Sequence, residues 1–257
     1  MNFKGLTHIK GILGMNALNV ASIAKNFSDD NNDAFKRYFY NCKALSSFFI
    51  TDFLEAETQN SATTYLYEKW DFTPWFNSSE NAQYLANIAE FFSGCRELSD
   101  TKYLTGLLNP RAFKIVNAKY LFKDTGFTKI KLDWTDKGCL ENIEGMFSGC
   151  VALTEAEINI FNLSKVTSLN QFFLNNENLN KVDLVLLSEM GEGYFKNIKT
   201  IDSMFQGCSR GLKEIDFSKT TEDNFQLYDF NNLTSAENLF EGCLKLNKVT
   251  FPNKANF

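Results

Sequence analysis

Residues 140–158 read LENIEGMFSGCVALTEAEI, and both halves of this stretch recur along the chain. The first half has close copies that end at Cys95 (LANIAEFFSGC), Cys208 (IKTIDSMFQGC) and Cys243 (LTSAENLFEGC). Looser copies are NDAFKRYFYNC at 32–42, IVNAKYLFKDT at 115–125 and VTSLNQFFLNN at 166–176. Such self-similarity indicates an array of structural repeats.

The second half of the stretch predicts a strand. It reads LTEAEI at 153–158, and its L-x-x-L-x-L pattern returns as LNKVDL (179–184), LKEIDF (212–217) and LNKVTF (246–251). The last three positions alternate apolar, polar and apolar, which is typical of a short strand with one buried face. The first half instead places apolar residues at i, i+3, i+6 and i+7, so we expect a short helix there that ends at the Gly before the Cys.

The spacing of the copies predicts the fold. Residues 95, 125, 150, 176, 208 and 243, which occupy the Cys site, are 30, 25, 26, 32 and 35 residues apart. A unit of this length cannot bury its own apolar side, so neighbouring units must stack on one another. We therefore expect an α/β solenoid of about six or seven leucine-rich repeats, each with a short helix and a short strand, and a parallel sheet on the concave face.

The string M-F-x-G-C-x-x-L-x-x-L-x-L also resembles a known family. It looks like the repeats of BspA-like leucine-rich-repeat surface proteins, in the variety common in mycoplasmas and other low-GC bacteria. The resemblance covers about residues 85–257, with a weaker unit at 34–50. It implies a bacterial surface protein that acts in adhesion or binding. The chain departs from the pattern at Thr125 and Asn176, which replace the Cys, and in longer units after Leu184 and Phe217.

The repeated Phe and Cys positions predict a packed interior. Equivalent positions of stacked repeats lie about 4.8 Å apart, so the Phe residues should form a buried ladder and the small thiols should fill the turn between helix and strand. Besides Phe122 and Phe173, the expected ladder comprises Phe92, Phe147, Phe205, Phe240, Cys95, Cys150, Cys208 and Cys243.

The same cysteines could instead hold a metal or form disulfides. No C-x-x-C pair is present and His8 is the single His, so we expect no metal and no cofactor. Disulfides stay open, because six Cys is an even count and Cys208 and Cys243 occupy neighbouring repeats. We expect free buried thiols, with Cys139 outside the pattern.

The pattern fails in two places. We interpret residues 1–33 as an N-terminal cap on a repeat region at 34–257, with an irregular insertion at about 52–84. Trp70 and Trp75 of the insertion either pack against the first repeats or form an exposed aromatic binding loop. Because the chain ends directly after a strand, either the natural protein continues beyond Phe257, which we expect, or Pro252 and the last few residues protect the open edge of that strand.

The polar residues of the strands are candidate binding residues. In a leucine-rich repeat the residue within L-x-L faces the concave side, and the candidates there are Lys102, Lys131, Glu157, Asp183 and Asp216. Asp133 and Asn159 are candidates in the next outward column. Carboxylates at 157, 183 and 216 would lie on three successive repeats and repel one another. Either a cation or a basic partner balances them, or they form a solvated acidic face flanked by lysines.

Composition limits the classes of function. The 257 residues are 44% hydrophobic, contain 26 Phe and carry a formal charge of −5 without a long basic run, which argues against nucleic-acid binding. No segment approaches the roughly 20 apolar residues of a membrane span. With one His and no nucleophile or phosphate-binding motif, we expect no enzyme.

The expected function is therefore binding. A module of a bacterial surface or secreted protein would recognise a protein or glycan through the repeat face. The alternatives are an intracellular scaffold or effector recognition domain in the cytoplasm, or the targeting module of a longer protein.

Overall fold

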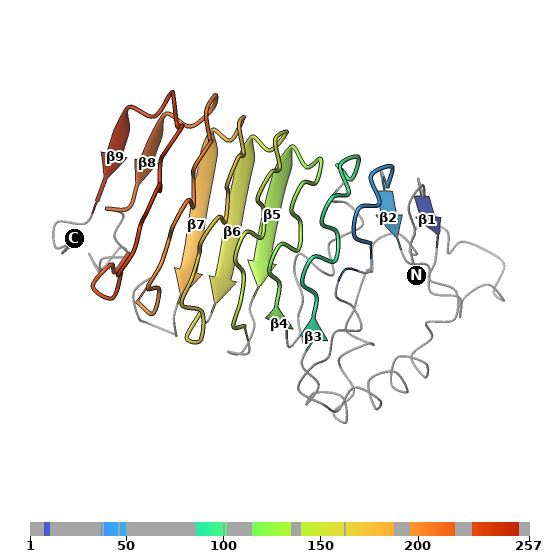
Figure 1. Ribbon diagram of the computed structural model, residues 1–257, viewed down its shortest axis with the longest axis horizontal. Helices are drawn as coiled ribbons and strands as arrows, with labels where there is room; N and C mark the ends of the chain where they lie inside the picture. The colour runs from blue at the N-terminus through green and yellow to red at the C-terminus, as the bar shows by residue number, and fades with distance from the viewer. Residues whose placement is uncertain are drawn as a thin grey trace, which may run out of the picture.

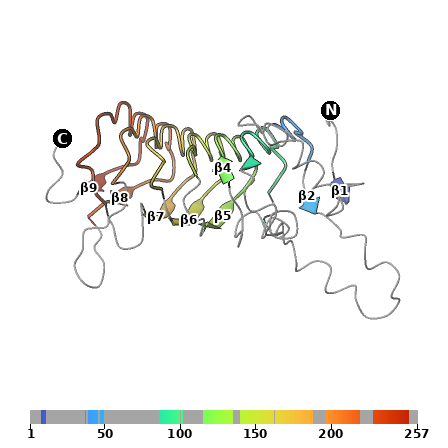
Figure 2. The ribbon, with the colours of Figure 1, turned by 90° about the horizontal axis from the view of Figure 1, so that it is seen from below.

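The computed structural model describes residues 8–10, 37, 39–45, 47–49, 86–99, 101, 115–134, 140–161, 163–187, 196–218 and 228–251. They form a row of similar rungs that follow one another in chain order (Figures 1 and 2). The insertion at about 52–84 lies outside the described residues, and so does the expected cap at 1–33 apart from His8–Lys10.

Short parallel strands make up the regular secondary structure of these residues. They are β1 (His8–Lys10), β2 (Ser47–Phe49), β3 (Ala86–Asn87), β4 (Ile115–Asn117), β5 (Lys129–Trp134), β6 (Glu155–Phe161), β7 (Lys181–Leu187), β8 (Glu214–Asp216) and β9 (Lys248–Thr250). Parallel pairing joins β1 to β2, β3 to β4, β5 to β6 to β7, and β8 to β9. This is a parallel repeat fold, and its longest strands lie where L-x-x-L-x-L predicted them.

The predicted helices are wrong for the described residues, where consecutive turns replace them. In residues 118–125, the N–H groups of Leu121, Lys123 and Thr125 donate to the carbonyls three residues back, at 3.1 to 3.3 Å. The N–H groups between them donate one rung onward at 2.8 to 3.0 Å: Ala118 to Asn142, Tyr120 to Glu144, Phe122 to Met146 and Asp124 to Ser148. Half of the backbone donors therefore hold adjacent rungs together, which an α-helix would not allow.

Positive φ angles explain why the helix fails. Each turn segment has two such residues four apart, for example Tyr120 (φ 54) with Asp124 (φ 55), and Gly145 (φ 57) with Gly149 (φ 73). A right-handed helix cannot pass through this conformation. The Gly before the Cys is therefore not a helix end but the second left-handed residue of a continuing run of turns.

The interior is a stack of aromatic rings. Along the rungs, neighbouring Phe rings lie 5.6 to 6.0 Å apart at interplanar angles of 6° to 21°: Phe92 on Phe122, Phe122 on Phe147, Phe147 on Phe173, Phe173 on Phe205, and Phe205 on Phe240. Apart from Phe240 on the last rung, these rings are fully buried. Phe172 packs edge-on against Phe147 and Phe173, and these contacts hold the stacked rings in place laterally.

The cysteines close each run of turns as free thiols. Cys42, Cys95, Cys150 and Cys208 are buried and Cys243 is half-buried. Each of four Sγ atoms donates to the carbonyl of a Phe on the preceding rung, at 3.0 to 3.4 Å: Cys95 to Phe39, Cys150 to Phe122, Cys208 to Phe173 and Cys243 to Phe205. Cys139 lies outside the described residues.

The two rungs without Cys use other polar groups at this site. Thr125 Oγ1 donates to the carbonyl of Phe122 at 2.8 Å. Asn176 Oδ1 accepts from the N–H of Cys150 at 2.9 Å, while its buried Nδ2 has no hydrogen-bond partner among the described residues. These substitutions keep a small polar group at the turn, although the Asn does so incompletely.

Candidate binding surface

Alternation along the strands creates one polar face. In β5, Ile130, Leu132 and Trp134 are buried, whereas Lys129 and Lys131 point to solvent. The parallel register places Lys131, Glu157 and Asp183 side by side on β5, β6 and β7. These outward residues and their equivalents on β8 and β9 are called the strand face below.

Charges of opposite sign alternate across the strand face. The first outward position of each strand reads Lys129, Glu155, Lys181, Glu214 and Lys248. Lys129 and Glu155 form an ion pair at 2.7 Å, which lowers the pKa of Glu155. Both side chains are largely exposed, so such a pair adds little stability.

The second outward position carries the predicted row of carboxylates. Lys131 forms an ion pair with Glu157 at 2.5 Å, and this hydrogen bond raises the pKa of Lys131. The negative charge of Glu157 is therefore balanced by Lys131 of β5, a pairing that the sequence did not predict. Asp216 Oδ1 accepts hydrogen bonds from the N–H and Oγ of Ser218, at 2.8 and 2.6 Å.

The other predicted residues divide into two groups. Asp133 and Asn159 are register partners on β5 and β6, so they belong to the strand face. Lys102 and the insertion residues Trp70 and Trp75 lie outside the described residues.

Two grooves cross the strand face. One, of about 280 Å³, runs over β5 to β7 and is lined by Thr101, Lys129, Lys131, Glu155, Glu157, Lys181 and Asp183, with Ile130 and Ala156. The other, of about 370 Å³, lies between β7 and β8 and reaches down to the buried Phe205. Both have polar rims.

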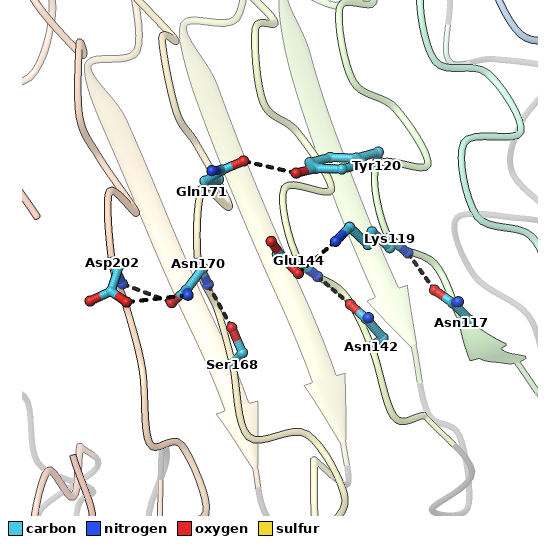
Figure 3. Close-up of polar contacts among 9 residues, drawn as sticks. All are labelled: Asn117, Lys119, Tyr120, Asn142, Glu144, Ser168, Asn170, Gln171 and Asp202. Atoms are coloured by element: carbon cyan, nitrogen blue, oxygen red, sulfur yellow. Dashed lines mark hydrogen bonds and ion pairs between the residues drawn. The ribbon is translucent and has the colours of Figure 1, made fainter. Parts of the chain in front are cut away.

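A second polar network lies on the opposite, turn side of the rungs, where sequence analysis proposed no site (Figure 3). Asn117 and Asn142 each accept the N–H two residues ahead, at 3.0 and 2.9 Å, and Ser168 does so at 3.2 Å. Lys119 forms an ion pair with Glu144 at 2.9 Å, which raises the pKa of Lys119. From β3 onward, the recurrence of Asn, Ser or Thr at the start of the turn segments is the signal that could have located this network.

Tyr120 spans three rungs on this side. Its hydroxyl donates to Gln171 Oε1 at 2.9 Å, two rungs away (Figure 3). Lys119 and Lys123 place their Nζ atoms 5.0 and 4.9 Å from its ring centroid. The ring covers Gly145, where an added Cβ would lie 2.0 Å from Tyr120 Cε1.

Comparison with known proteins places this repeat pattern in a family. The family described as "Mycoplasma protein of unknown function, DUF285" matches residues 116–251, more than half of the chain. The chain belongs to the DUF285 family. The matched residues of this DUF285 chain run from the second residue of β4 to just after β9, so they include the turn-side network and both grooves apart from Thr101.

Other comparisons add little to this assignment. The DUF285 chain is 17% identical to a leucine-rich repeat protein from Bacteroides ovatus, with a TM-score of 0.29 over 83% of this chain and 51% of that one. It therefore spans about half the length of that protein. No curated protein matches it.

Two further observations concern the described residues of this DUF285 chain. No group of three or more His, Cys, Asp or Glu side chains among them is arranged to hold a metal ion. Within the same residues, no helix is long and apolar enough to cross a membrane.

Proposed function

We propose that this chain is a non-enzymatic binding module, a leucine-rich-repeat solenoid of the BspA-like kind that recognises a partner protein through its strand face. The observation that carries the proposal is the pair of grooves, of about 280 and 370 Å³, bordered by outward charged residues of β5 to β9. Grooves with polar rims on a rigid support are suited to holding segments of another chain.

The aromatic stack beneath the strand face supports this proposal. Phe122, Phe147 and Phe173 are fully buried and stacked, so the backbone that carries the face is held in one arrangement. A preorganised surface loses less conformational entropy on binding than a flexible one. The alternating charges would then set which partner fits and in what register.

The proposed setting is adhesion at the bacterial surface or after secretion. It rests on the family assignment and on the repeat sequence, which resembles BspA-like surface proteins. A glycan partner and a cytoplasmic scaffold are the competing possibilities, and the experiment below includes both.

The experiment measures binding of the fluorescently labelled chain to cultured host cells, to immobilised matrix proteins and to a glycan array. The test variant is Asp183→Ala/Asp216→Ala on the strand face. Its matched control is Glu237→Ala/Glu241→Ala, which removes two exposed carboxylates elsewhere on the chain.

We expect saturable binding to cells or matrix protein that the strand-face variant weakens and the control variant leaves unchanged. Binding to glycans alone, or equal weakening by both variants, would contradict the proposed partner or face. Antibody labelling of intact bacteria tests the location, and labelling only after lysis would favour the cytoplasmic scaffold.

A further inference from the structure

The sheet is interrupted between β7 and β8. The three-stranded sheet ends at β7, and a separate pair begins at β8 (Figure 1). On the turn side the same two rungs stay bonded, for example from the N–H of Asn175 to the carbonyl of Gln206 at 2.7 Å. The two rungs are therefore joined at one side and apart at the other.

The β8 rung has one additional residue before its strand, Gly211, because Leu212 follows Cys208 by four positions whereas Leu153 follows Cys150 by three. This residue accounts for the interruption. At the start of β7, the N–H groups of Asn180 and Lys181 both donate to the carbonyl of Thr154 on the preceding rung. On the β8 rung, the two N–H groups that share one acceptor on the preceding rung are those of Arg210 and Gly211, and their acceptor is the carbonyl of Glu177. Because this contact comes before the strand instead of at its first residues, β8 leaves the line of the sheet.

Gly211 itself fits only because it has no side chain. A Cβ there would lie 2.5 Å from the carbonyl oxygens of Asn178 and Leu179. Farther along the gap, the hydroxyl of Tyr228 donates to the carbonyl of Leu184 at 2.8 Å, and its ring packs edge-on against Phe217. A side-chain hydroxyl thus donates a hydrogen bond to this β7 carbonyl.

The rest of the gap is the groove of about 370 Å³. Apolar residues of the core, Leu184, Phe205, Ile215 and Phe217, form its inner part. Its rim carries Lys181 and Asp183 from β7, Glu214 and Asp216 from β8, and Lys248 and Thr250 from β9. An apolar floor below a polar rim matches a strand, whose successive side chains point in and out.

The charges indicate which segment fits. By the repeat pattern, Lys181 is level with Glu214 and Asp183 is level with Asp216. An outward side chain at the first level would have opposite charges on its two sides. At the second level it would have a carboxylate on each side, which favours a Lys or Arg.

We infer that the β7–β8 groove binds an extended segment of a partner protein as an added strand, with apolar side chains on the floor and a basic side chain between Asp183 and Asp216. This inference rests on the proposed function and names its site and the chemistry of the partner. Main-chain hydrogen bonds would supply affinity and the basic residue specificity, as in other cases of strand addition.

The test is fluorescence anisotropy with a fluorescein-labelled octapeptide, GSLRLTGS, and its acidic counterpart, GSLELTGS. The chain is compared with Asp183→Asn/Asp216→Asn and with Glu237→Gln/Glu241→Gln, a matched double control outside this groove and outside the strand face. Circular dichroism of each variant establishes that it is folded. A photo-leucine version of the basic peptide locates the bound segment by cross-linking.

The basic peptide should bind saturably and about ten-fold or more tightly than the acidic one. The double variant should lose about ten-fold in affinity, the control should lose none, and cross-links should fall within 180–184 and 214–217. Equal affinity for both peptides, no binding, or cross-links elsewhere would overturn the inference. If the chain still bound cells or matrix protein in that case, the proposed function would stand without this site.

Discussion

The close approach of Tyr120 to Gly145 leads to a prediction about stability. In Gly145→Ala the new Cβ would lie 2.0 Å from Tyr120 Cε1 and 2.3 Å from Cδ1, so the ring must move. Moving it breaks the hydrogen bond to Gln171 and the contacts with two lysines, a loss of about 1–3 kcal/mol. The φ of 57° adds about 1–2 kcal/mol for any residue with a Cβ.

We therefore expect Gly145→Ala to lower the free energy of unfolding by about 2–5 kcal/mol. In a Tyr120→Ala background there is no ring to displace, so the same change should cost only the backbone share of about 1–2 kcal/mol. Urea denaturation followed by circular dichroism measures all four members of this double-mutant cycle.

Gly149→Ala is the matched control. Its φ is also positive, but its added Cβ would meet Asp124 Oδ1 instead of the Tyr120 ring. Its cost should be the same whether or not Tyr120 is present. If Gly145→Ala cost as much with Ala at position 120 as with Tyr, the ring would not be what keeps position 145 a glycine.

Three more predictions follow from the core. Phe147→Ala should lower the free energy of unfolding by about 3–5 kcal/mol, because Phe147 is fully buried between two rings. Phe240→Ala should lower it by clearly less, because Phe240 lies on the last rung. Equal losses for the two variants in urea denaturation would contradict the stack as described. Burial raises the pKa of the Cys150 thiol from 9.0 to about 11, so the folded state holds this proton more tightly, and stability that is complete below pH 9 should fall between pH 9 and 11. Cys150→Ala should weaken that alkaline decline in pH-dependent unfolding, and an unchanged decline would assign it to other groups. Asn176→Thr should raise the free energy of unfolding by about 1 kcal/mol, because it removes the unpaired Nδ2 and supplies the hydroxyl that Thr125 uses at the same site. Urea denaturation measures this change. A lower urea midpoint than that of the unchanged chain would show that the hydrogen bond between Asn176 and Cys150 contributes more to stability.

The strands were predictable because their signal is local. L-x-x-L-x-L marks β6, β7, β8 and β9, and its alternation predicted that Ala156 and Ile158 would be buried on either side of the more exposed Glu157. The spacing of the repeats also predicted parallel pairing of successive units. In a strand, successive side chains point to opposite sides of the backbone, so the alternation of apolar and polar residues directly gives the side on which each residue lies.

The helices were mispredicted because one spacing fits two structures. Ala118, Leu121, Phe122 and Thr125 are buried at i, i+3, i+4 and i+7, as they would be on a helix, yet successive turns bury the same positions. The positive φ angles of Tyr120 and Gln171 could not be predicted from the sequence, because neither residue is a Gly or Asn, the types that commonly adopt this conformation. The interruption at β7–β8 was visible only as the additional Gly211, and its effect depends on carbonyls of another rung.

The direction of the backbone donors between rungs has an electrical consequence. Within the turn segments, as at Tyr120 and Phe122, the inter-rung N–H groups point toward the C-terminal neighbour, so their peptide dipoles add along the axis of the row. The N–H groups just before each segment, such as that of Asn142, point the other way and offset part of this sum. The last rung is then the electropositive end, and it carries the exposed carboxylates Glu237 and Glu241, as the N-terminus of a helix carries acidic residues.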